Sequence, residues 1–171
     1  QLAKTAFSLL YKNIKIATFE GSKIESRESM LIGSMLAGLA FANSSVGAVH
    51  ALSYPLGVIY NLPHGESNAL VLVPIMRFNL KNAFPLYAEL SRTVNSEMIF
   101  KSDFEAASLL INQLETLILD LKLSTKLSHF GIGEKELNNL TDCTLLQKRL
   151  LSYNCSEMSK EDIYQAFKNI L

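Results

Sequence analysis

Two histidines that lie in a segment without charged residues are the strongest candidates for a chemical role in this sequence. His50 and His64 lie in the segment Met30–Gly65, which contains no Asp, Glu, Lys or Arg. Neutral imidazole is a good ligand for Zn²⁺ or Fe²⁺, so a pair of metal ligands is one interpretation. Two hydrogen-bonded core histidines are the other, because an unpaired polar group in an apolar environment costs free energy. The residue types leave both interpretations open.

Spacing does not complete a metal site. A catalytic metal needs about three protein ligands and one open position. Glu66 follows His64 by two residues, so on a helix it would point elsewhere. No H-E-x-x-H motif is present, and no Asp is followed by His four residues later. The third histidine, His129, is predicted to lie at the surface in a polar loop.

Composition narrows the class of protein. The chain has 171 residues, with 16 Lys plus Arg and 16 Asp plus Glu, so its formal net charge is zero. This balance argues against a nucleic-acid partner. Hydrophobic residues make up 49% and charged residues 19%, which excludes intrinsic disorder. Two cysteines, Cys143 and Cys155, cannot build a disulfide framework, so a reducing, cytoplasmic setting is expected. Polar residues and Pro55 and Pro63 interrupt the charge-free segment, so no membrane span is expected.

Hydrophobic periodicity predicts helices throughout and no strand. We expect helices over residues 2–18, 26–44, 46–56, 66–79, 83–94 and 103–122, with shorter ones over 134–140 and 145–153 and a last one capped by Ser159. Pro74 is expected to kink its helix rather than end it. The predicted fold class is all-α, a multi-helix bundle in a single domain over residues 1–171. Residues 30–80 are expected to form a buried central layer.

Two motifs stand at a specific separation in the charge-free segment. The first is G-x-x-F-x-N-x-x-x-G-x-x-H-A, which begins at Gly38 and places His50 at its histidine. The second is P-H-G-x-x-N-A, which begins at Pro63 and contains His64. Together with the loop at residues 127–132 and with Asn154, they resemble the iron-containing (group III) alcohol dehydrogenase family. The similarity covers essentially the whole chain and is to the helical C-terminal domain of this dehydroquinate synthase-like fold.

The resemblance implies a metal and a nucleotide cofactor. Family members have an N-terminal α/β domain that binds NAD or NADP and a helical C-terminal domain, with a divalent metal (Fe²⁺ or Zn²⁺) in the cleft between them. One Asp and three His hold that metal, and His50 and His64 match the last two ligands. The other two come from a D-x-x-x-H segment that would precede Gln1. The chain is therefore expected to be a fragment that lacks its N-terminal dinucleotide-binding domain, from a homodimeric parent.

Two aromatic residues match family positions near the substrate and cofactor. Phe41 matches a position that faces the substrate pocket, with an ordinary core Phe as the alternative. Tyr54 departs from the family, which mostly has a second His here, near the nicotinamide and assigned to proton transfer. A phenol has a reference pKa of about 10, against about 6.5 for imidazole, so it is a poorer proton shuttle at neutral pH. Tyr54 is the catalytic candidate, and a pocket-lining aromatic residue is its alternative.

The resulting hypothesis is the metal-binding helical half of an NAD(P)-dependent alcohol or hydroxy-acid dehydrogenase. Its substrate would be a small alcohol or hydroxy acid, and the isolated chain is expected to be inactive and to hold metal weakly. Without the other wall of the cleft, part of the apolar segment is expected to be exposed. A non-catalytic helical interaction module that retains the family sequence is the alternative.

Overall fold

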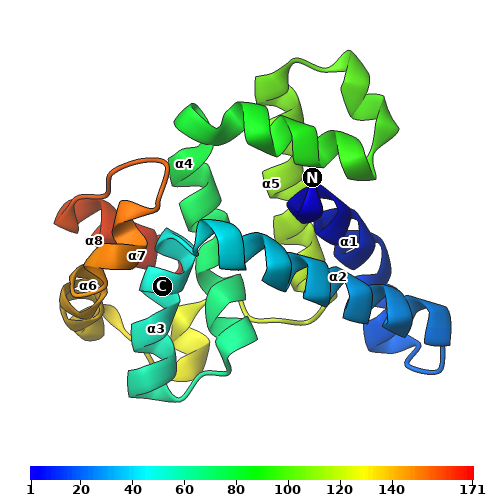
Figure 1. Cartoon of the computed structure of the whole chain (residues 1–171). Helices are drawn as coiled ribbons and strands as arrows, with labels where there is room; N and C mark the ends of the chain where they lie inside the picture. Colours follow the sequence, from blue (N-terminus) through cyan, green and yellow to red (C-terminus); the bar gives the residue numbers. More distant parts are fainter. The chain divides into compact units, whose positions relative to one another are not determined.

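The computed structural model describes residues 1–171, and all of its secondary structure is helical (Figure 1). The α-helices are α1 (Leu2–Phe19), α2 (Ile24–Ser44), α3 (Ala48–Tyr60), α4 (His64–Val94), α5 (Asp103–Asp120), α6 (Leu137–Leu145), α7 (Lys148–Ser152) and α8 (Lys160–Lys168). Short 3-10 helices lie at η1 (Ser96–Phe100), η2 (Leu127–Phe130) and η3 (Glu134–Glu136). The all-α prediction is confirmed.

The ends of α1, α2 and α5 lie within two residues of the predicted ends, whereas α3 continues four residues past its predicted end at Leu56 and α6 covers residues 137–145 instead of 134–140. Ser159 accepts a hydrogen bond from the backbone N–H of Asp162, whose carboxylate bonds back to the Ser159 N–H, forming a capping box for α8. Asn61, at φ 55°, ends α3 in the left-handed conformation that asparagine tolerates. The helix α2 begins at Ile24, two residues before its predicted start at Ser26. Ser26 lies buried within the helix, and Lys23 occupies the N-cap.

The largest difference concerns α4. We predicted separate helices over 66–79 and 83–94, but one helix of 31 residues runs from His64 to Val94 through Pro74 and Pro85. No glycine lies between the two predicted helices, and the helix continues through Lys81 and Asn82 although Pro85 has no N–H to donate to the Lys81 carbonyl.

The chain divides into two compact units, each built from two separate stretches. The first unit comprises Gln1–Ser45 and Ala83–Gln113, and the second comprises Val46–Asn82 and Leu114–Leu171. The second unit holds the main core, in which fully buried side chains of α3, α4 and α6 pack with α8, among them Leu52, Ile75, Leu140 and Phe167. The prediction of a single domain over 1–171 stays a prediction.

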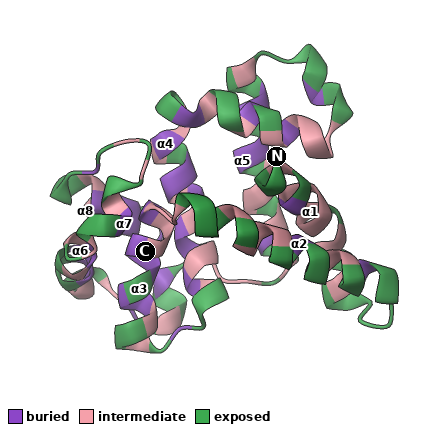
Figure 2. Cartoon of the chain, viewed as in Figure 1, coloured by how far each residue is buried: buried purple, intermediate pink, exposed green.

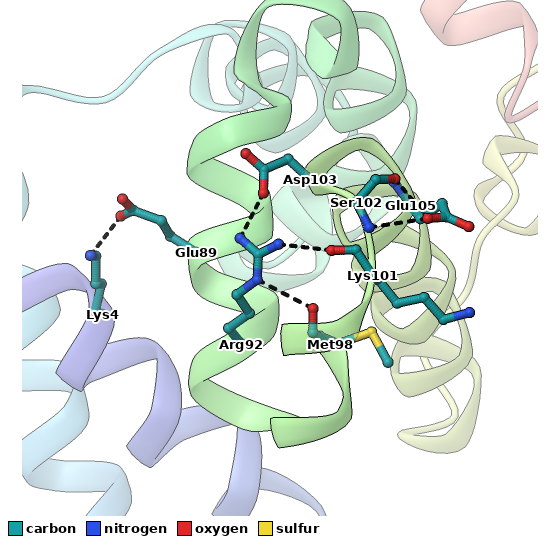
Figure 3. A network of polar contacts seen from close by, with 8 residues as sticks. All are labelled: Lys4, Glu89, Arg92, Met98, Lys101, Ser102, Asp103 and Glu105. Atoms are coloured by element: carbon teal, nitrogen blue, oxygen red, sulfur yellow. Dashed lines mark hydrogen bonds and ion pairs between the residues drawn. The ribbon is translucent and has the colours of Figure 1, made fainter.

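In the first unit, one arginine joins three consecutive segments (Figure 3). The Arg92 guanidinium, near the end of α4, donates to the carbonyl oxygens of Met98 and Lys101 at 3.2 and 3.1 Å. It also forms an ion pair with Asp103, at the start of α5, at 2.7 Å. Two charge-assisted hydrogen bonds and an ion pair from one planar group fix the path of the chain between the two helices.

The helix α2 is exposed, contrary to expectation. We predicted residues 30–80 to form a buried layer, but the only buried residues of α2 are Ser26 and Gly33. Figure 2 shows it mostly exposed or intermediate. Large apolar side chains on it face solvent, with Leu31 at 73% and Met35 at 57% exposure. The buried layer predicted for residues 30–80 therefore begins only at α3, while the prediction that part of the apolar segment is exposed is confirmed.

No single helix is both long and apolar enough to cross a membrane. Only α2 and α3 taken together, with a break between them, pass the same criteria of length and composition.

Candidate metal centre

The position of His50 follows from the amphipathic pattern of α3. The core-facing side of this helix consists of the buried residues Ala48, Ala51, Leu52, Pro55 and Leu56. His50 and Tyr54 are four residues apart, so they share the other side of the helix. His50 is half-buried, and its backbone N–H donates a hydrogen bond to the carbonyl oxygen of Gly47 at 3.1 Å. His50 therefore belongs to the first turn of α3, on the edge of the core.

His64 is the first residue of α4 and is exposed. The turn before it is fixed by Leu62, which is buried in the core, and by the Pro63 carbonyl, which accepts hydrogen bonds from both the backbone N–H and the hydroxyl of Ser67 at 2.9 Å. The buried Leu62 side chain and the hydrogen bonds in the first turn of α4 therefore fix the backbone position of His64.

The two imidazoles face each other. The centres of the His50 and His64 rings are 5.3 Å apart, with an angle of 50° between their planes. Two imidazoles on one metal ion each place a nitrogen about 2.1 Å from it, which brings their ring centres to about 5 Å. The distance between the two ring centres therefore fits binding of one metal ion by both imidazoles. The angle between the ring planes shows that the rings are not stacked in parallel.

The environment favours neutral imidazole at His50. Burial lowers the pKa of His50 below its ordinary value, and the nearby charge that His64 can carry lowers it further. A metal ligand must present a deprotonated nitrogen, so a lowered pKa leaves the lone pair available over a wider pH range.

Asn68 holds the His64 ring. Its side-chain Nδ2 donates a hydrogen bond to Nε2 of His64 at 3.0 Å, one helical turn away, so the neutral imidazole carries its proton on Nδ1. The Oδ1 atom of Asn68 is buried and has no hydrogen-bond partner. Binding of a metal through Nε2 would replace this contact, and binding through Nδ1 would leave a proton on Nε2, which the amide nitrogen cannot accept.

The aromatic candidates occupy different units. The Tyr54 ring is edge-on to His50, with ring centres 6.5 Å apart and planes at 87°, and it is 40% exposed. Its side chain thus lies on the same face of α3 as His50. Phe41 lies on α2 in the first unit, with 54% of its side chain exposed, so it is not an ordinary core Phe within this chain.

The chain itself offers no complete metal site. No group of three or more His, Cys, Asp or Glu side chains within residues 1–171 could hold a metal ion. His129 lies in the 3-10 helix η2, where its Nδ1 is 2.9 Å from the Ser124 hydroxyl. The sequence pointed to two ligands, and the structure brings those two together without a third.

A separate cavity of about 550 Å³ lies elsewhere in the second unit. Its walls include Leu70, Val73, Arg77 and Ala166, and Arg77 forms an ion pair with Glu115 at 2.6 Å. Neither histidine of the pair lines this cavity.

Comparison with known proteins identifies the chain's relationships. The sequence model described as "Fe-containing alcohol dehydrogenase family, C-terminal" matches residues 1–171. The chain belongs to this family. The match to the C-terminal part of the family confirms the resemblance carried by the two histidine motifs.

The similarity to individual relatives covers most of this chain but less than half of each relative. The chain is 36% identical over 162 residues to "Long-chain-alcohol dehydrogenase 1" of Geobacillus thermodenitrificans, covering 95% of this chain and 41% of the relative. It is 38% identical over 151 residues to the "4-hydroxybutyrate dehydrogenase" of Clostridium kluyveri, covering 86% and 39%. A crystal structure of 1,3-propanediol oxidoreductase superimposes with a TM-score of 0.94 at 28% identity, covering 99% and 44%. The chain spans about two fifths of the length of these family members.

Proposed function

We propose that this chain is the metal-binding helical half of an NAD(P)-dependent alcohol or hydroxy-acid dehydrogenase, and that His50 and His64 supply two of the metal's ligands. The observation that carries the proposal is the 5.3 Å approach of the two rings from separate helices. The family's remaining Asp and His ligands and its dinucleotide-binding domain would lie in a part of the parent protein outside this chain. The parent would be a homodimer, as the family resemblance implies.

Each residue near the histidine pair would have its own role in such a site. A divalent cation held by His50 and His64 would supply Lewis-acid polarisation of a substrate oxygen. A bound nicotinamide would supply the hydride chemistry. His50 and His64 orient their lone pairs, and Asn68 holds the His64 ring. The absence of charged side chains from Met30 to Gly65 keeps competing charges away from the pair and favours exclusion of water.

Tyr54 would hold or move a proton at its hydroxyl oxygen. The phenol lies on the same face of α3 as His50, one helical turn further along. In this role it takes the place of the second histidine that most of the family has. Phe41 is proposed to contact the substrate or cofactor in the complete protein, since its exposed ring has room for such a partner.

A metal titration of the 171-residue chain tests the ligand pair. We expect weak Zn²⁺ or Fe²⁺ binding, because two imidazoles leave the ion half coordinated. His50→Ala and His64→Ala should each abolish the binding, whereas His129→Ala should leave it unchanged. Nanomolar affinity in the isolated chain, or equal binding by the two histidine variants and the parent chain, would contradict the proposal.

The activity is tested on the full-length parent. We expect oxidation of small alcohols or of 2- or 4-hydroxy acids with NAD or NADP, lost on chelation and restored by Fe²⁺ or Zn²⁺. His50→Ala should abolish it. The alternative, a non-catalytic interaction module, predicts no metal-dependent turnover with any of these substrates and no D-x-x-x-H segment upstream of the chain.

A further inference from the structure

A buried pair of asparagines joins a late loop to α4. Nδ2 of Asn79 donates to Oδ1 of Asn154 at 2.8 Å, and Nδ2 of Asn154 donates back to Oδ1 of Asn79 at 2.8 Å. The Asn154 amide also donates to the Ser156 carbonyl at 2.8 Å. Asn79 is 5% exposed. Asn154 is partly buried, and the two reciprocal amide hydrogen bonds fix the loop against α4.

The backbone of the same loop packs against the start of α3. A methyl group placed on Gly47 would lie 3.7 Å from both the Asn154 Cα and the Tyr153 carbonyl oxygen. Gly47 is the N-cap of α3, and its carbonyl accepts hydrogen bonds from the N–H groups of His50 and Ala51 at 3.1 and 3.2 Å. The loop therefore contacts the turn from which the His50 ring projects.

These contacts connect the two helices that carry the histidine pair. Asn79 lies on α4, about four turns beyond His64. Asn154 bonds to Asn79 through its side chain and packs against Gly47 through its backbone. The short connection at Leu62 and Pro63 already joins the end of α3 to the start of α4. The Asn79–Asn154 pair therefore secures the opposite end of α3, where His50 lies.

We propose that Asn79 and Asn154 are positioning residues that set the separation of the His50 and His64 rings by fixing the first turn of α3 against α4. This inference rests on the proposed function only for the statement that the two imidazoles bind a metal ion. The separation itself is a property of the metal-free chain. Neither asparagine reaches the imidazoles, so both act through Gly47 and the first turn of the helix.

A neighbouring hydrogen bond provides a matched control. Nδ2 of Asn82 donates to the hydroxyl of Ser156 at 3.0 Å, which also ties the loop to α4. Asn82 is exposed and has no contact with Gly47. Asn82→Ala removes a loop-to-helix bond without disturbing the asparagine pair.

The ring separation is measured directly by NMR on the 171-residue chain. The parent chain should show a nuclear Overhauser effect between ring protons of His50 and His64. Asn154→Ala should abolish it and, in the metal titration, lower affinity by about tenfold or more, as loss of a supporting hydrogen bond typically does. Asn82→Ala should retain the ring-to-ring signal and the affinity, even if its thermal stability falls.

A second pair of variants covers the case in which Asn154→Ala does not fold. Gly47→Ala should be tolerated, since its methyl group would make only an ordinary contact at 3.7 Å. Gly47→Val should push the loop away and abolish the ring-to-ring signal while the asparagines are intact. An unchanged signal in folded Asn154→Ala, or in folded Gly47→Val, would overturn the inference. Failure of the parent chain to bind metal with this signal present would instead overturn the proposed function alone.

Discussion

At the scale of the residue, the geometry of the histidine pair depends on few atoms. One imidazole projects from the first turn of α3 and the other from the first residue of α4, and each is oriented by local bonds: the Gly47 carbonyl at the base of one and the Asn68 amide beside the other. Each ring is thus placed by its own turn, and the approach of the rings depends on how the two turns are held.

The role proposed for Tyr54 can be separated from that of the ligands. In the full-length parent, Tyr54→Phe should lower kcat by about 100-fold or more, the usual contribution of a positioned proton donor. Metal content should be unchanged, because the phenol is not a proposed ligand. Steady-state kinetics and metal analysis on the same preparation measure both quantities.

Tyr54→His provides the matching gain of function. It restores the residue that most of the family has at this position, and its pKa near 6.5 suits proton transfer at neutral pH. Activity should recover relative to Tyr54→Phe, with a pH profile shifted toward neutrality. Equal kcat for the Phe variant and the parent would assign Tyr54 a pocket-lining role only.

At the scale of the element, two glycines of α2 differ in what surrounds them. A methyl group on Gly33 would lie 2.8 Å from Cγ of Leu10 in α1, whereas one on Gly38 would meet only the Phe41 ring of its own helix, at 4.0 Å. Gly33 thus permits close packing of α1 and α2. Around Gly38, the methyl group would contact no other helix.

This difference predicts opposite effects of the same substitution. Gly33→Ala should destabilise the chain by about 1–3 kcal/mol through overpacking. Gly38→Ala should stabilise it by about 0.5–1 kcal/mol, since alanine is the better helix former. Urea unfolding of both variants measures the two free energies. Similar effects of the two substitutions would contradict the packing assigned to Gly33.

The start of α5 should respond to pH. Ser102 and Glu105 form reciprocal hydrogen bonds, with the Ser102 hydroxyl donating to the Glu105 carboxylate at 2.7 Å and Oγ accepting from the Glu105 N–H at 3.3 Å. Hydrogen bonds from the Ser102 hydroxyl, and then from its backbone N–H, lower the pKa of Glu105 below its ordinary value of 4.5. The carboxylate therefore stabilises the folded state at neutral pH, and this contribution is lost as the pH falls below 4.5 through the lowered pKa.

The matching experiment compares Ser102→Ala with the parent chain across pH. The variant should be less stable at pH 7, and the difference should shrink as the pH falls through the lowered pKa of Glu105. Ser108→Ala serves as the control, because its hydroxyl bonds only to the Phe104 carbonyl within the same helix. A difference independent of pH would show that the hydroxyl caps the helix without perturbing the carboxylate.

At the scale of the whole molecule, the apolar residues are distributed unevenly between core and surface. The second unit buries Leu52, Leu56 and Ile75 completely or nearly so. Other large apolar residues, including Leu31 and Met35 on α2 and Val58 on α3, are 57–81% exposed. Exposed apolar side chains on this scale are typical of a surface that another part of a protein covers.

Substitutions should therefore have different effects on the chain and on the parent. Leu31→Gln with Met35→Gln should change the unfolding free energy of the 171-residue chain by less than about 0.5 kcal/mol. Leu52→Ala in the core should cost about 2–5 kcal/mol. In the full-length parent the double variant should lower stability, because these side chains would be buried there. Differential scanning calorimetry on both proteins tests the contrast, and a large loss in the chain alone would contradict it.

The sequence by itself determined the helical class, the family and the two histidines, because hydrophobic periodicity and short motifs are local properties of the chain. The contact between Asn68 and His64 also follows from local spacing, since residues four apart share a helix face. Only the tertiary structure decided that α4 is continuous, that α2 is exposed and that Asn154 reaches both Asn79 and Gly47. These features depend on which distant segments pack together: a helix that is apolar all round has the same pattern whether its partner is in this chain or absent from it.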